Sequence, residues 1–291
     1  MDARQRILAS VAFALLCAVT PAQALPADTQ TRSVDAGGYP VPLEGFMRLT
    51  GTVAFDADRR VSAYALDRAA DVPEEVRTFL ARQVADWRIE FDPGVVPPDG
   101  PLQFTVRVRA SPEGDGLYRL WLDGRDLTDV LPAAQRLRAK RMWPPDYPRG
   151  MLRIGASGIA YTQVLLDRSG TVLDLFTDQV DLTAVPADPA DIPRYQREFA
   201  ASAAAAVRRW RFLVPEEGPY ARDRLVVRIP IGFDIRGRTV PYGQWEYLIR
   251  GVRGTSPWQA AGGEPEVAAS AGVQPLRPRL RLVSAASGLE G

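Results

Sequence analysis

The order of apolar and polar residues along the chain predicts the same series of elements twice. In the first copy, apolar residues alternate with polar ones over 49–55 and 61–66, which is typical of two half-buried strands joined by a turn. Apolar residues then recur every three or four positions from Val76 to Trp87 and predict an amphipathic helix. Alternation returns over 104–108 and predicts a third strand.

The second half of the chain repeats this order. Alternation over 160–166 and 171–176 predicts two strands around a turn, and an alanine-rich apolar stripe from Phe199 to Trp210 predicts a helix. A third alternating stretch, 225–233, closes the copy. The second copy is longer because of an Asp- and Pro-rich stretch from Asp178 to Pro193, and surface loops tolerate such insertions.

A tryptophan–arginine pair marks the end of the predicted helix in each copy. Trp87 is followed by Arg88, and Trp210 is followed by Arg211. A residue that recurs together with its context indicates that one small unit is used twice. The predicted fold class is α+β, with two tandem small units that each pack a three-stranded antiparallel sheet with helix. We interpret both tryptophans as core anchors, and stacking on a ligand is the alternative.

Composition and apolar patterning together divide the chain into seven predicted segments. The predicted organisation is a signal peptide at 1–24, a flexible leader at 25–40, the first unit at 41–112, a connector at 113–141, the second unit at 142–235, a C-terminal extension at 236–254 and a disordered tail at 255–291. We expect an extra strand at 117–121, a short helix at 133–141, and packing of 240–252 on the second unit. The tail is rich in Gly, Ala, Ser and Pro and has little apolar pattern, which is typical of disorder.

The first residues have the pattern of a secretory signal. Arg4 and Arg6 precede an apolar stretch at 7–19, and Ala22-Gln23-Ala24 has the small residues of a cleavage site. The apolar stretch is shorter than the roughly 20 residues that a membrane-spanning helix needs. We therefore expect cleavage after Ala24 and export to a bacterial periplasm. An uncleaved anchor and a lipoprotein site at Cys17 are the alternatives.

Charge and residue types narrow the function. The net charge of +1, from 36 basic and 35 acidic residues, argues against nucleic acid or an anionic membrane as the main partner. The chain has no histidine, and its one cysteine lies in the predicted signal peptide, which removes most hydrolase triads, thiol nucleophiles and common zinc sites. We expect no catalytic residue, no metal and no cofactor. An enzyme would need a site built from Asp and Glu alone.

Several motifs of the second unit occur in a fixed order. They are Pro145-Asp146-Tyr147-Pro148, Gly155-Ala156-Ser157-Gly158, the strand–turn–strand from Val164 to Val172, the helix end from Ala206 to Phe212, and the strand from Val227 to Phe233. With these motifs, about residues 142–235 closely resemble the C-terminal domain of TonB-family energy transducers. The first unit resembles a degenerate copy of this domain, because it keeps the turn and the Trp-Arg pair but lacks the Tyr-Pro entry and the turn glycine.

The resemblance implies a small α+β domain that binds outer-membrane transporters. Such domains pair an edge strand with a short extended segment of the transporter, so that main-chain hydrogen bonds provide the affinity. Pro230 has no N–H and favours an edge position for the closing strand, although preventing aggregation is an equal alternative for this proline. The residues expected to contact a partner are Tyr147, Pro148, Leu225, Val226, Val227, Arg228 and Ile229.

The chain also departs from the family pattern. An energy transducer of this family has a membrane helix with a histidine and a long Pro-rich spacer, and this sequence shows neither. The leading hypothesis is a non-catalytic periplasmic binding protein linked to TonB-dependent transport, with an outer-membrane transporter or another envelope protein as its partner. The alternative is an energy transducer anchored in the inner membrane by residues 7–19.

Overall fold

Most of the chain beyond residue 42 is described. The computed structural model describes residues 43–97, 99–114, 117–128, 131–183, 186, 188–235, 237, 240–258, 273–275 and 279–284. The predicted signal peptide and leader lie outside these residues. Among the residues described, no helix is both long and apolar enough to cross a membrane. Backbone contacts group Val41–Gly291 into one unit.

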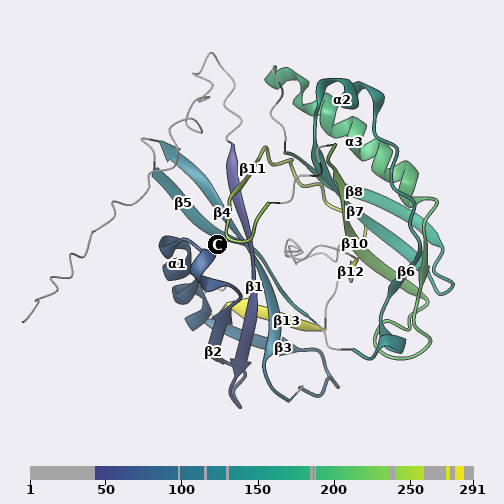
Figure 1. Cartoon of the computed structure of the whole chain (residues 1–291). Coiled ribbons are helices and arrows are strands. Elements are labelled where there is room, and N and C mark those ends of the chain that lie inside the picture. Colours follow the sequence, from purple (N-terminus) through teal and green to yellow (C-terminus); the bar gives the residue numbers. More distant parts are fainter. Residues whose placement is uncertain are drawn as a thin grey trace, which may run out of the picture. The chain divides into compact units, whose positions relative to one another are not determined.

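The first sheet is antiparallel and has five strands. They are β1 (Glu44–Phe55), β2 (Val61–Leu66), β4 (Leu102–Gly114), β5 (Leu117–Leu127) and β11 (Glu246–Leu248). The order is β11-β1-β4-β5, and β2 also pairs with β1 (Figure 1). Leu49 lies opposite Val106, so apolar positions that alternate in the sequence fall on one face of the sheet. The three predicted strands and the extra strand are confirmed, and β11 is added to them.

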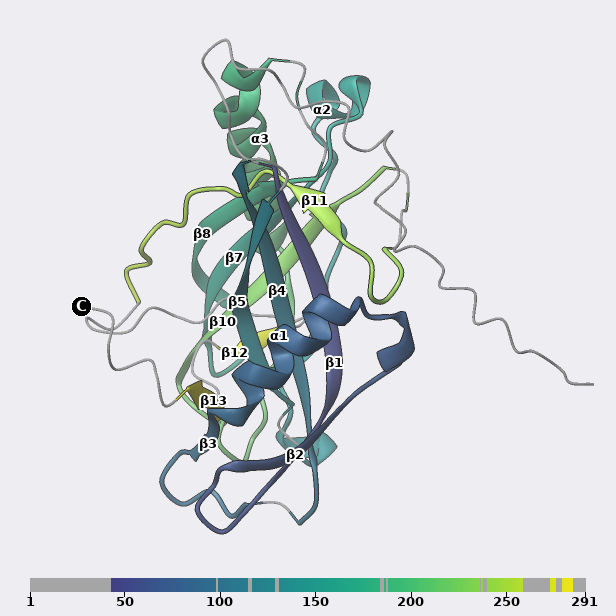
Figure 2. The same ribbon diagram turned by 90° about the vertical axis from the view of Figure 1, so that its left-hand side faces the viewer.

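Helix α1 (Glu74–Ala85) lies across the apolar face of this sheet (Figure 2). Its buried residues Val76, Leu80 and Val84 belong to the same hydrophobic cluster as the apolar residues of β1 and β4. These buried residues have the helical spacing that the sequence predicts, but the helix ends at Ala85. Trp87 therefore begins the next element instead of ending the helix.

The second sheet repeats this arrangement with four strands in the order β12-β10-β7-β8. Its strands are β7 (Gly158–Asp167), β8 (Val172–Leu182), β10 (Arg224–Phe233) and β12 (Gln274–Pro275). Helix α3 (Ile192–Val207) packs on β7 and β8 (Figure 1). The strands β7, β8 and β10 are the predicted three. The class is therefore α+β with antiparallel sheets, and both sheets have more strands than the sequence predicts.

A short strand follows each helix and begins at or beside the repeated tryptophan. These strands are β3 (Trp87–Phe91) and β9 (Arg211–Leu213). Both tryptophan side chains are buried, with exposed fractions of 1% for Trp87 and 3% for Trp210. The interpretation of both residues as core anchors is confirmed. The strands themselves were missed, because the tryptophans continue the apolar stripe of the preceding helices and were assigned to them.

The turn between β1 and β2 and the turn between β7 and β8 have the same side-chain hydrogen bonds. The Oδ1 atom of Asp56 accepts from the backbone N–H groups two and four residues later, and that of Asp167 does the same. The short strands meet these turns in the same way, since Ile89 N donates to Arg59 O at 2.8 Å and Phe212 N donates to Gly170 O at 2.9 Å. Arg59 thus occupies the position of the turn glycine and has a left-handed φ of 63°.

Alanine substitutions at these two equivalent positions should have different effects. At Gly170, φ is +80° and an added Cβ would lie 2.0 Å from the Phe212 carbonyl oxygen, so Gly170→Ala should lower the free energy of unfolding by about 2 kcal/mol or more. Arg59 already carries a Cβ, and Arg59→Ala removes mainly a guanidinium 5.4 Å from the Phe91 ring, worth about 0.5 kcal/mol. Urea unfolding of both variants measures the difference, and equal losses would contradict it.

Two other expectations are corrected by the structure. The helix expected at 133–141 is reduced to a helical turn at Ala133–Gln135, and Arg138–Arg141 is a strand, β6, that pairs with β9. The segment 240–252 contacts both sheets, because β11 pairs with β1 while Ile249 bridges Leu182 of β8. The short length of each pairing leaves too little alternation to recognise in the sequence.

The predicted disordered tail is also corrected where the structure describes it. Residues 274–275 form β12 on the second sheet, and β13 (Leu280–Ser284) pairs antiparallel with β3. Leu280 and Leu282 are buried in the first hydrophobic cluster. Their alternation spans only five residues after a long polar and small-residue stretch, so it gave a weak signal.

Candidate functional site

Strand β10 carries five of the seven residues expected to contact a partner. Leu225, Val227 and Ile229 point into the hydrophobic cluster beneath helix α3 and are almost fully buried. Val226 is half-buried, and Arg228 is 2% exposed. Most of these side chains are therefore committed to the fold, and the strand can offer a partner its main chain more readily than its side chains.

The outer edge of β10 is partly occupied by the chain itself. Strand β12 pairs antiparallel with it, with Pro275 opposite Val227 and Gln274 opposite Arg228. The sequence had predicted an unpaired edge over Leu225–Ile229, and this is wrong at Val227 and Arg228. The remaining edge positions of β10 have no strand partner within the residues described. Only a two-residue strand covers the edge, and such a strand carries no detectable alternation.

The opposite edge of the second sheet is covered as well. Ile249 and Leu182 exchange two backbone hydrogen bonds of 2.8 and 2.9 Å, and Gly254 N donates to Asp178 O at 2.7 Å. Between them, Gly251 lies so close to β8 that an added Cβ would stand 2.1 Å from the Val180 carbonyl oxygen. The segment 249–254 therefore lies along β8 and protects this edge from pairing with other chains.

Tyr147 and Pro148 lie apart from Leu225–Ile229. The Tyr147 hydroxyl donates to the Ala156 carbonyl oxygen, and its ring makes edge contacts with Phe199 and Phe233 at centroid distances of 5.9 and 5.8 Å. Burial raises the pKa of this tyrosine. Pro148 precedes helix α2 (Arg149–Ile154) as its N-cap. Both residues thus fix the entry of the chain to the second sheet, and Tyr147 reaches only the far end of β10.

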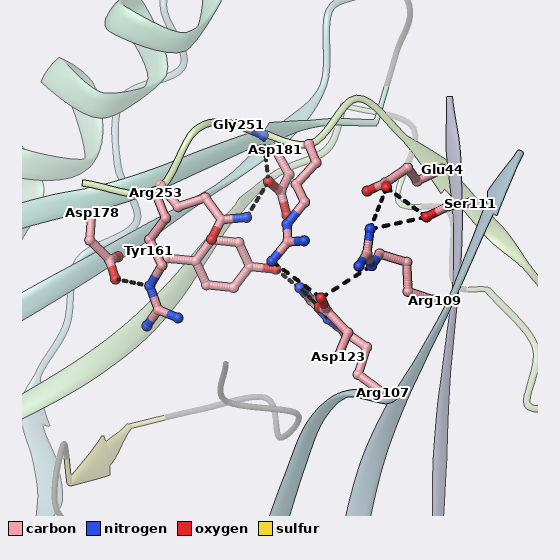
Figure 3. A network of polar contacts seen from close by, with 12 residues as sticks. Glu44, Arg107, Arg109, Ser111, Asp123, Tyr161, Asp178, Asp181, Gly251 and Arg253 are labelled. Carbon is pink, nitrogen blue, oxygen red and sulfur yellow. Dashed lines mark hydrogen bonds and ion pairs between the residues drawn. The ribbon is translucent and has the colours of Figure 1, made fainter. Parts of the chain in front are cut away.

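A buried cluster of charged and polar residues lies on the sheet faces that do not carry the helices. We call it the arginine–aspartate cluster. Its members are Glu44, Arg107, Arg109, Asp123, Tyr161, Gln163, Asp178, Gln179, Asp181, Arg228, Arg250 and Arg253. Figure 3 shows how the side chains from the first sheet meet those from the second. Buried charges are costly unless they are paired, so this cluster has the character of a site rather than of an ordinary core.

One half of the cluster centres on Asp123. Its carboxylate pairs with Arg107, whose Nε donates at 2.8 Å, and with Arg109 and Arg250 at 3.5 and 3.2 Å. Burial alone lowers the pKa of Arg107, but the neighbouring Tyr161 and Asp123 outweigh it and the pKa is raised. Arg107 therefore stays charged. At the border of this half, Arg109 Nη1 also donates a hydrogen bond to Glu44 Oε1 at 2.6 Å.

Tyr161 connects this half to the other one. Its hydroxyl accepts from Arg107 Nη1 at 2.8 Å, and its ring lies between two guanidinium groups, with the Cζ of Arg228 at 4.3 Å and that of Arg107 at 5.9 Å from the centroid. Burial raises the pKa of Tyr161 against the opposing effect of both arginines. The tyrosine therefore keeps its proton and is a poor candidate for a general base.

The other half of the cluster centres on Asp178. Arg228 Nε donates to its two oxygens at 3.0 and 3.3 Å, Arg253 Nε lies 3.4 Å away, and Gln163 Nε2 donates at 3.1 Å. The side chains of Asp178 and Arg228 are 0% and 2% exposed. One fully buried carboxylate thus faces two guanidinium groups, that of Arg228, which is buried, and that of Arg253, which is 22% exposed.

Asp181 completes the cluster from the end of β8. Its Oδ1 accepts from Gln179 Nε2 at 2.7 Å and from the backbone N–H of Gly251 at 3.0 Å, while its Oδ2 has no hydrogen-bond partner among the described residues. Burial raises the pKa of this carboxyl, and the hydrogen bonds and nearby arginines only partly oppose it. The described residues hold no group of three or more metal-ligating side chains.

Arg228 is the one member of this cluster among the residues that the sequence predicts to contact a partner, and that prediction rests on its place in the closing strand. Arg107 alternates with apolar residues in its strand, and such a pattern usually indicates a solvent-exposed face. The signal that could have found the cluster is that both sheets place arginine on the same non-helical face. Comparison with family models, with curated proteins and with solved structures gave no match. The edge of β10 and the arginine–aspartate cluster therefore carry the functional argument.

Proposed function

We propose that the protein is a non-catalytic binding protein of the periplasm that holds an extended segment of an envelope protein at the edge of β10. The observation that carries this proposal is the pairing of β12 with β10, since it is an antiparallel pairing of the kind that β-augmentation requires. The favoured partner is a TonB-dependent outer-membrane transporter. This choice rests on the sequence motifs of residues 142–235 and their resemblance to the TonB C-terminal domain.

We also infer that the chain contains two tandem TonB-C-like units. The repeated strand order, the shared turn hydrogen bonds and the two buried tryptophans support this duplication. The second unit keeps the turn glycine, whereas Arg59 replaces it in the first. In this proposal the second unit binds the partner and the first keeps the fold.

A partner would have to displace β12 from the edge. That strand makes only two residue pairs with β10, and one of its two residues is a proline that has no N–H to donate. A longer extended segment could pair with more of the strand, up to Pro230, and would therefore form more main-chain hydrogen bonds than β12 does. The exchange is a competition between two extended segments for one edge.

Site-specific photo-crosslinking in intact cells tests this proposal. A crosslinker at Val226 on β10 should yield a product that contains a TonB-dependent transporter, and the matched position Leu173 on β8, which is 50% exposed, should not. Adding Gln274→Pro, which removes the last N–H of β12, should raise the yield severalfold. Equal products at Val226 and Leu173, or a yield that Gln274→Pro leaves unchanged, would contradict edge pairing.

The mass of the mature N-terminus separates a cleaved periplasmic chain from an anchored transducer.

A further inference from the structure

Arg228 has an open pair of hydrogen-bond donors inside the protein. Its Nε is engaged by Asp178, but Nη1 and Nη2 are buried and have no hydrogen-bond partner among the described residues. The residue as a whole is 2% exposed, so bulk water does not satisfy these groups. A buried donor without an acceptor is costly, and a charged one is more costly still. A hydrogen-bond acceptor placed beside Nη1 and Nη2 would remove this cost.

The surroundings of Arg228 favour a negatively charged acceptor. Asp178, its ion-pair partner, also faces Arg253 at 3.4 Å. The pKa of Arg253 is lowered, first by burial and next by the charge of Arg228. Positive charge therefore prevails at the free end of Arg228, where an anion would be stabilised by a low local dielectric.

The geometry of the free end narrows the class of anion. The two Nη groups form a planar fork that matches the two oxygens of a carboxylate. The Cζ atom of Arg228 lies 4.3 Å from the centroid of the Tyr161 ring, in a cation–π contact. Gln163 supplies a second recognition element, because its Nε2 is bound to Asp178 while its Oε1 is buried and has no partner among the described residues. This oxygen could accept from a hydroxyl group next to the carboxylate.

We propose that Arg228, with Gln163 beside it, forms a binding site for the carboxylate of a small hydroxy acid. The site is separate from the edge of β10, which offers the main chain of the same residue. Entry is easiest beside Arg250 and Arg253, whose side chains are 29% and 22% exposed at the border of the cluster. Binding would satisfy the free donors of Arg228 and stabilise the folded chain.

Thermal unfolding of the full-length mature protein in sodium malate tests the site. Compared with sodium chloride and sodium phosphate at equal ionic strength, saturating malate should raise the midpoint by about 5 °C, the size expected when a ligand far above its Kd binds a chain of this length. Arg228→Lys keeps the charge beside Asp178 but lacks the fork, so it should lose the malate-specific rise. Arg224→Lys, an exposed arginine at the start of β10, is the matched control and should keep it.

Two results would overturn the proposal. One is a rise that is equal in malate, phosphate and chloride, and the other is a malate-specific rise that survives Arg228→Lys. If Arg228→Lys does not fold, arginine side-chain NMR of the unmodified protein gives the answer. Malate should shift slowly rotating Nη signals saturably, and the absence of such a shift would equally refute the site. Neither measurement depends on whether a partner binds the edge of β10.

Discussion

Replacing Asp178 with asparagine should lower the free energy of unfolding by about 3 kcal/mol. The side chain is fully buried and pairs with Arg228, which is buried as well, and with Arg253. Asparagine keeps the shape of aspartate but removes its charge, so the substitution leaves two guanidinium groups without this counter-charge. Urea unfolding near neutral pH measures the loss.

The control for this substitution lies on the same strand. Asp174 is exposed, and within the described part of the chain its carboxylate accepts only from the N–H of Leu175, so Asp174→Asn should change stability by no more than about 0.5 kcal/mol. Salt provides a second check, because a buried pair is screened far less than a surface pair. A loss at Asp178 that matched the one at Asp174, or that disappeared in high salt, would show that the cluster is not a buried charge network.

Replacing Trp210 with alanine should destabilise the protein by about 3–5 kcal/mol. The side chain is 3% exposed within the cluster beneath α3, and its Nε1 donates to the Trp143 carbonyl oxygen at 2.7 Å. Trp143→Ala is the matched control, since that side chain is 58% exposed and its carbonyl remains after substitution. Thermal or urea unfolding should show only a small change for the control.

Phenylalanine at each repeated tryptophan separates packing from hydrogen bonding. Trp210→Phe removes a donor from the Trp143 carbonyl and should cost about 1 kcal/mol more than Trp87→Phe. The Nε1 of Trp87 is buried without a hydrogen-bond partner among the described residues, so its removal relieves an unsatisfied group. Equal costs at the two positions would mean that the bond to Trp143 adds nothing.

The central strands and helices could be predicted from the sequence because they are long enough to show their period. Strands β1 and β7 are twelve and ten residues long and contain the alternating stretches 49–55 and 160–166, and α3 repeats its apolar stripe along 16 residues. The strands that were missed are short. β3, β9 and β12 have five, three and two residues, and their pairing is decided by distant segments rather than by a local pattern.

The candidate site was less accessible to sequence reasoning than the fold. Pro230 and the motifs around it indicated the edge of β10. The sequence did not predict that β12, from the C-terminal part of the chain, pairs with this edge. The arginine–aspartate cluster escaped because a polar residue that alternates with apolar ones is normally exposed. Whether Arg107 faces water or another sheet depends on what packs against its face, and no single strand contains that information.

The two units of the proposed duplication share some features and differ in others. Both keep the aspartate turn and the buried tryptophan, which hold the sheet, the helix and the short strand together. Gly170 of the second unit lets the short strand approach the turn without strain, and within the described residues the third strand of that unit, β10, pairs with the short strand β12.

The pairing of β13 with β3 has a consequence for the order in which the chain acquires its structure. Residues 87–91 are synthesised long before their strand partner, residues 280–284. Contacts between such distant segments form slowly, because a long loop must close before they stabilise anything. The two-stranded sheet of β3 and β13 therefore cannot form until residues 280–284 have been synthesised, and only then can Leu280 and Leu282 join the first hydrophobic cluster.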